Sequence, residues 1–309
     1  MLMNREDKAA LKAIEIRLKT VLPEQYQDCY EEVQPISMGS AGLKYGSDGK
    51  VAWNDIWGSF CDLAMAGGPP HKGVLLEPAS REDIEAQMDR YQQVAKEICR
   101  GVSLVTDRVS KPSLLSGWIQ VQCESSCMAD WLVRAIVMEN VSARHKDSAL
   151  YLPAGPGFRL EKEIKNVITV IAKTWHYWVD HIWLSQQREI EDLFARMAAE
   201  SQLLVPGFQE TVNQSLERQR LAEKITQAIH QSTWLCTSNH NYSGWLGVEC
   251  GEVRAAIWMM RALVVSNVLS RREGTVLFVP LNAELDSNGE IVVRKFREVH
   301  SFARLRNVL

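Results

Sequence analysis

Long apolar runs and a cysteine framework are both missing from this chain of 309 residues. No apolar stretch approaches the roughly 18 residues that span a bilayer. The N-terminal segment MLMNREDKAALKAIEIRL carries charges throughout, unlike a secretory signal. The seven cysteines are scattered and odd in number, and a chain of this length can bury a core without disulfide bonds. We therefore expect a cytoplasmic protein with free thiols and no membrane partner.

A strong charge of either sign is also missing. The formal net charge is -3 and the pI is near 6.2, so no positive field is available to bind phosphates along a nucleic acid. We expect no nucleic-acid partner. One basic stretch lies near the C-terminus, and the apolar residues that interrupt it are typical of an amphipathic element with one solvated face. Its basic residues are Arg294, Lys295, Arg297, Arg304 and Arg306.

The common catalytic signatures do not occur. The sequence contains no Gly-x-Ser-x-Gly elbow, no His-Glu-x-x-His helix, no Walker motif and no dinucleotide fingerprint. The cofactor, the reaction type and the existence of any enzymatic activity are therefore left open.

Tryptophan is abundant, with ten residues. Such side chains make large apolar contacts in a core, a subunit interface or a ligand pocket. Because exposed aromatic area is usually covered, we expect a homodimer.

The chain contains an internal repeat. Residues 116–153 align with residues 243–280 at a shift of 127 without a gap, and 15 of the 38 positions are identical. Random pairing at typical residue frequencies gives about two or three identities. The shared positions include Trp118/Trp245, Cys123/Cys250, Trp131/Trp258, Arg134/Arg261, Asn140/Asn267, Arg144/Arg271 and Pro153/Pro280.

Each copy has the pattern of a strand, a buried helix and a second strand that ends at proline. This order predicts a right-handed crossover between two parallel strands. A helix and a further strand are predicted ahead of each copy, with these strands at residues 102–106 and 233–237. We predict an α/β fold, with α+β as the alternative, built from two β-β-α-β units with a mixed sheet and helical layers. Roughly half of the chain should be helical.

Four segments are predicted within one compact assembly. They are an N-terminal helical and hairpin region (1–78), the first unit (79–159), a connecting helical segment (160–205) and the second unit (206–309). Residues 160–202 lack proline and glycine and predict one long helix or two in series. A helix is expected at residues 53–65, and hairpin turns at residues 46–49 and 286–289.

The repeat helps to separate structural residues from candidate site residues. A residue present in both copies most simply serves the shared fold. Cys123 and Cys250 sit between a strand and a helix, where a thiol can be reactive, but we interpret them as small residues that fill this corner. Cys127 lies one turn after Cys123, without a second Cys or His pair nearby, so we expect no metal site.

Two arginines lie inside apolar helical runs, where an unpaired charge is costly. Asp130 stands one turn before Arg134, but Ile257 occupies the matching position before Arg261. Arg134 and Arg261 are therefore candidates for binding an anionic ligand, with a structural ion pair as the alternative.

The run AGGPPHKG at residues 66–73 has no counterpart in the second copy. Gly67 and Gly68 allow a bound group to approach the backbone, and the prolines stiffen the path that presents His71 and Lys72. His71 can exchange a proton near neutral pH and Lys72 can meet a negative charge. We predict His71 and Lys72 as catalytic residues and Gly67 and Gly68 as ligand-binding residues. A tight structural connector is the alternative.

Two other segments carry polar side chains at helix or strand ends. His240 lies in a polar linker between two strands of the second unit and is a third ligand-binding candidate. His176 and Asp180 lie one turn apart in the aromatic run WHYWVDHIW and could form an acid–base or second-shell pair. Aromatic residues at this spacing also suit a core or a dimer interface.

The sequence best fits a protein that binds a small anionic metabolite or cofactor in a cleft between the two halves, with turnover possible. The alternative from another class is a non-catalytic, oligomeric interaction protein with a tryptophan-rich interface.

Overall fold

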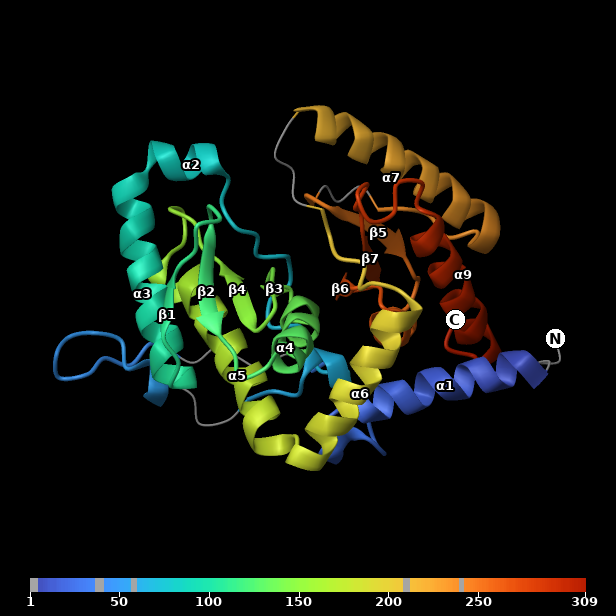
Figure 1. Ribbon diagram of the computed structural model, residues 1–309, viewed down its shortest axis with the longest axis horizontal. Helices are drawn as coiled ribbons and strands as arrows, with labels where there is room; N and C mark the ends of the chain where they lie inside the picture. Colours follow the sequence, from blue (N-terminus) through green and yellow to red (C-terminus); the bar gives the residue numbers. More distant parts are fainter. Residues whose placement is uncertain (1–4, 37–41, 57–59, 208–211, 239–241) are drawn as a thin grey trace. The chain divides into compact units, whose positions relative to one another are not determined.

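The computed structural model describes residues 5–36, 42–56, 60–207, 212–238 and 242–309 (Figure 1). The chain is 52% helical and 13% strand, which confirms that about half of it is helical. Its helices accompany small antiparallel sheets, the arrangement of an α+β protein. The chain divides into one unit of Pro23–Gln187 and another of Met1–Leu22 with Arg188–Leu309. Among the described helices, none is both long and apolar enough to cross a membrane.

The Pro23–Gln187 unit contains a four-stranded sheet in the order β1-β2-β4-β3. Helices α3 and α4 contact its strands, and α5 packs against both helices (Figure 1). The elements are η1 (Glu24–Tyr26), η2 (Trp53–Asp55), η3 (Ala64–Ala66), α2 (Arg81–Ala86), α3 (Met88–Thr106), β1 (Ser110–Pro112), β2 (Trp118–Gln122), α4 (Ser126–Met138), β3 (Arg144–Lys146), β4 (Ala149–Pro153), η4 (Leu160–Ile164) and α5 (Lys165–His181).

The second unit contains a three-stranded sheet in the order β5-β7-β6. Helix α8 contacts β6 and β7, and α9 packs against α7 and α8. The elements are α1 (Arg5–Val21), α7 (Val212–Thr233), β5 (Trp245–Glu249), α8 (Val253–Val264), β6 (Arg271–Glu273), β7 (Val276–Pro280) and α9 (Glu290–Leu305), with α6 (Leu184–Glu200) crossing the boundary between the two units. The predicted pair of helices in series is therefore confirmed as η4 with α5, followed by α6.

The elements of the two aligned stretches occur in the same order and register. The strands β2, β3 and β4 have the bounds of β5, β6 and β7 at a shift of 127 residues. The backbone repeats as well, because four pairs of residues at this shift share a positive φ angle. These pairs are Asp107/Trp234, Gly117/Gly244, Asn140/Asn267 and Asp147/Gly274.

The predicted pairing of parallel neighbouring strands is wrong. Strand β2 pairs with β4 in antiparallel register, and β5 pairs with β7 in the same way. The cause is the three-residue strand that follows each helix, β3 or β6. It reverses the chain before the next strand, so the final strand lies between two strands that run opposite to it.

Two of the predicted strands are also wrong. Residues 102–106 form the last turns of α3, because Val94, Ile98 and Val102 continue one buried helical stripe. Thr233 ends α7, and Thr237 makes only an isolated bridge with Val248.

Two predictions outside the repeats fail for local reasons. The expected helix at residues 53–65 is replaced, in its described part, by the short turns η2 and η3. The expected hairpin at residues 286–289 instead begins α9. The Asp286 carboxylate accepts hydrogen bonds from the N–H groups of Ile291 and Val292, as a helix cap does. The turn at residues 46–49 is present, and Tyr45 and Val51 form a bridge across it.

The strand–helix corners are filled by Cys123 and Cys250, which are both buried. Burial raises the pKa of each thiol to about 12. A thiol with this pKa is protonated at neutral pH and therefore a poor nucleophile. Their environment supports the interpretation that both cysteines fill space in the fold.

Candidate functional site

A buried ion pair organises the glycine–proline segment of the Pro23–Gln187 unit. Lys173 on α5 and Glu139, which follows α4, are 1% and 0% exposed, and 2.9 Å separates Nζ from Oε1. Lys173 also donates to the Asp62 carbonyl at 2.9 Å and to the Cys61 sulfur at 3.3 Å. Burial acts to lower the pKa of Lys173, but Glu139 and Cys61 outweigh it and the pKa is raised. Lys173 is therefore protonated and positively charged at neutral pH.

Glu139 joins the two ends of the segment. Its Oε1 accepts the N–H of Ala64 at 2.9 Å, and its Oε2 accepts the N–H of His71 at 2.8 Å. The Glu139 carbonyl accepts the N–H of Lys72 at 3.2 Å. Asn140 adds a hydrogen bond from Nδ2 to the Lys72 carbonyl at 2.8 Å. Glu139 and Asn140 thus hold residues 64–72 against the end of α4.

The two glycines of the segment have clear conformational roles. Gly67 follows η3 with a φ of 107°, which strains a residue with a side chain. A Cβ atom on Gly68 would lie 2.2 Å from the Asp62 carbonyl oxygen and 2.6 Å from its carbonyl carbon. The absent side chain at Gly68 therefore allows two stretches of backbone to touch, and this contact supports the alternative of a structural connector.

His71 and Lys72 are both half-buried. The Nε2 atom of His71 lies 3.1 Å from Oδ1 of Asn166 on α5. Burial lowers the pKa of His71 to about 4, assisted by Lys173 and opposed by Glu139. This imidazole is neutral at pH 7, so it could act there as a base but not as an acid. The predicted catalytic roles of His71 and Lys72 stay a prediction.

Substituting Gly68 by alanine is expected to destabilise the protein by about 1–3 kcal/mol, because the new methyl group overlaps the Asp62 backbone. Thermal unfolding measures the effect. Gly73→Ala is the matched control, since a Cβ there meets no atom within 4 Å. Equal melting temperatures for Gly68→Ala and the wild type would show that the backbone contact is unimportant.

The other predicted ligand-binding residues are not gathered at this segment. Arg134 is buried on α4, and its Nε and Nη2 atoms bond both oxygens of Asp130 at 3.0 and 3.2 Å. Arg134 therefore forms the structural ion pair that was expected as the alternative to ligand binding. Arg261 is buried on α8 in the other unit. His240 lies outside the described residues. In the described ranges, no group of three or more His, Cys, Asp or Glu side chains could hold a metal.

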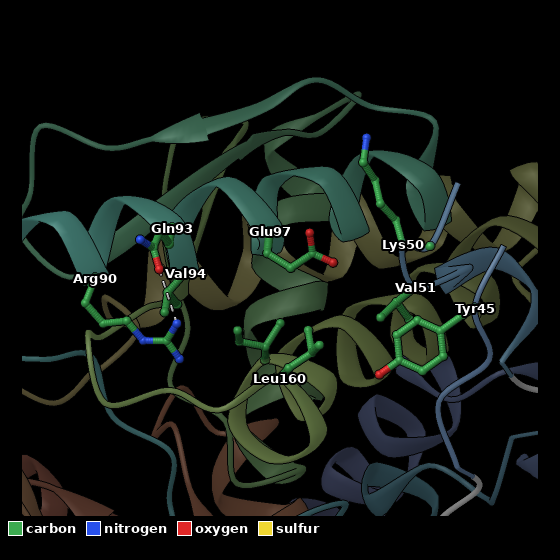
Figure 2. Close-up of a pocket in the computed structure, with 10 residues that line it drawn as sticks. Tyr45, Lys50, Val51, Arg90, Gln93, Val94, Glu97 and Leu160 are labelled. Carbon is green, nitrogen blue, oxygen red and sulfur yellow. Dashed lines mark hydrogen bonds between the residues drawn. The ribbon is translucent and has the colours of Figure 1, made fainter. Parts of the chain in front are cut away.

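A groove in the same unit holds different residues. Its volume is about 260 Å³, and it runs between α3, the turn at residues 46–49 and η4. Val51, Val94 and Ile164 are buried and form its apolar part. Figure 2 shows Arg90 and Gln93 near one end and Tyr45 and Lys50 near the other. The lining residues are Tyr45, Gly49, Lys50, Val51, Arg90, Gln93, Val94, Glu97, Leu160 and Ile164.

The charges along the groove favour an anion. Glu97 accepts hydrogen bonds from Arg100 at 2.6 and 2.9 Å and from Trp53 at 2.8 Å, so its charge is compensated. Arg90 donates only to the Gln93 side chain and the Phe158 carbonyl, both at 3.4 Å, among the described residues (Figure 2). Both hydrogen bonds are long and have uncharged acceptors, so N–H groups of the Arg90 guanidinium are left to bind a carboxylate or phosphate.

Sequence reasoning missed this groove. Arg90, Gln93 and Glu97 are spaced to lie on one face of α3, but helix periodicity does not reveal which face stays open. One signal was available from the repeat. At a shift of 127, these positions hold Glu217, Arg220 and Lys224. The groove residues thus belong to one half of the chain, as expected for a site rather than for the shared fold.

No protein-family model, curated protein or solved structure matches the chain.

Proposed function

We propose that this protein binds a small amphipathic anion in the groove of the Pro23–Gln187 unit. The observation that carries the proposal is Arg90, a guanidinium without a described carboxylate partner, beside an apolar floor of Val51, Val94 and Ile164. Arginine meets a carboxylate or phosphate with two parallel hydrogen bonds. The acid group of the ligand would bind at Arg90, and its apolar body would lie toward Leu160 and Tyr45.

The size of the groove limits the ligand. Ligand pockets typically have volumes of about 300–1,000 Å³, and this one is about 260 Å³. A small monocarboxylate or monophosphate fits that volume, whereas a dinucleotide cofactor exceeds it. The groove therefore supports the metabolite rather than the large cofactor among the ligands expected from the sequence.

Calorimetric titration with matched acids and amides tests the proposal. Phenylacetate and octanoate should bind at least tenfold more tightly than phenylacetamide and octanamide, because a hydrogen bond to a charged group contributes about 1.5–3 kcal/mol. Arg90→Gln should remove this preference. Lys96→Gln is the control, since Lys96 is an exposed residue of α3 that does not line the groove. Equal binding of acid and amide, or full affinity in Arg90→Gln, would exclude the site.

We further infer that the two units arose by duplication of one ancestral unit. The shared strand bounds and the four matched positive φ angles support this origin. A hydrogen bond that recurs in both units outside the aligned stretches also supports this origin. Thr106 donates to the Val102 carbonyl at 2.8 Å, and Thr233 donates to the Ile229 carbonyl at 2.7 Å. On this view the groove is a later specialisation of one copy.

A further inference from the structure

Two histidine rings converge at the C-terminal end of α5. The Nε2 atoms of His176 and His181 lie 3.2 Å apart, with ring centroids separated by 4.8 Å and ring planes at 81°. Residues five apart on a regular helix point about 140° away from each other. The rings nevertheless meet at the end of the helix, where His181 is the last residue of α5 and the backbone becomes extended at Ile182.

The two imidazole rings meet at an angle through their Nε2 atoms. The centroid separation of 4.8 Å is shorter than two rings in line through these nitrogens would give, and the Nε2 atoms are within hydrogen-bond distance of each other. Two nitrogen ligands at about 2.0–2.1 Å from a tetrahedral zinc ion are separated by roughly 3.3–3.4 Å. The observed 3.2 Å is close to this separation.

The neighbouring carboxylate selects the tautomer that a metal requires. Oδ2 of Asp180 lies 2.6 Å from Nδ1 of His176. Asp180 therefore accepts the Nδ1 proton, so in a neutral imidazole the Nε2 atom carries the lone pair. A carboxylate that orients a ligating histidine in this way is a regular feature of metal sites.

The rings are held in place yet open to solvent. Phe60 lies 5.5 Å from the ring of His176, and Tyr177 lies 5.2 Å from the ring of His181. The side chain of His176 is 41% exposed. An ion can reach the pair from solution without unfolding the helix.

From this geometry we infer that His176 and His181 bind one first-row divalent transition-metal ion through their Nε2 atoms, with Asp180 as the positioning residue. Imidazole ligands suit Cu²⁺, Ni²⁺ and Zn²⁺, with Cu²⁺ bound most tightly. Within the described residues no third ligand from a Cys, His, Asp or Glu side chain joins the group. The remaining positions belong to water, so the bound ion is exchangeable and can accept a further ligand.

Titration of the full chain, without a histidine tag, with CuCl₂ tests the site, followed by electron paramagnetic resonance and calorimetry. One Cu²⁺ per chain should bind with nitrogen hyperfine splitting. Either His176→Ala or His181→Ala should weaken binding at least tenfold, and Asp180→Asn should weaken it about tenfold, as loss of an orienting group does.

The controls separate this site from general copper binding. His230→Ala removes an exposed histidine of α7 and should leave the affinity unchanged. Circular dichroism should show an intact fold for every variant before metal is added. The inference is overturned if the wild type binds no more copper than the double variant His176→Ala/His181→Ala. It is also overturned if the bound copper lacks nitrogen hyperfine splitting, in which case the two rings form only a hydrogen bond.

Discussion

Replacing Glu139 by alanine is expected to lower the free energy of unfolding of the Pro23–Gln187 unit by about 3–5 kcal/mol. The substitution leaves the Lys173 ammonium buried without its counter-charge. It also leaves the N–H groups of Ala64 and His71 without their acceptors, and each buried unsatisfied donor is costly. Urea unfolding measures the loss, and hydrogen exchange should show faster opening of residues 61–76.

Two variants identify the cause of this loss. Glu85→Gln removes an exposed carboxylate that pairs with Arg81, and exposed pairs of this kind contribute at most about 1 kcal/mol. Glu139→Ala/Lys173→Met removes the isolated charge, so it should be more stable than Glu139→Ala alone. If Glu139→Ala unfolds at the urea concentration of the wild type, the ion pair does not hold the segment.

Acidification from pH 6.5 to pH 4 is expected to remove up to roughly 3 kcal/mol of stability through His71 alone. Burial lowers its pKa to about 4 in the folded chain, from an ordinary value of 6.5. As the pH falls, the unfolded chain therefore binds this proton first, and protonation favours unfolding. The contribution is fully present above about pH 6.5 and is lost as the pH falls through the folded-state value.

The variant His71→Gln isolates this effect, because it cannot titrate while every other group is retained. Unfolding free energies are measured in urea across this pH range for both proteins. The wild type should lose more stability than His71→Gln toward pH 4, and the difference should level off below the folded-state pKa. Parallel curves for the two proteins would contradict the prediction, because they would mean that folding does not lower the pKa of His71.

The repeat shows what residue patterns can predict about the fold. Trp118/Trp245 and Pro153/Pro280 mark the outer ends of paired strands that do recur at the predicted shift. The helices between them were also recognisable, because their apolar residues follow helical spacing. The strand direction was not, since it depends on the three residues 144–146, which are too few to give a periodic signal.

The candidate sites were harder to predict for the same physical reason. Glu139 and Lys173 are 34 positions apart, and each resembles an ordinary charged helix residue until packing removes both from water. His176 and Asp180 were predicted as a pair from their spacing, but helical spacing does not predict the contact between His176 and His181, which are five positions apart. The groove combines α3, a turn and η4, and no local pattern relates these segments.

The sequence by itself determined the periodic features of this protein, which are its helices, the matched strands and the small residues at strand–helix corners. These features depend on neighbours within one or two turns of the chain, where residue spacing decides which side chains are buried. The tertiary structure alone decided which strands pair, which charges are buried together and which helix face stays open. These properties depend on contacts between distant segments, whose free energy comes from packing and desolvation in the folded chain.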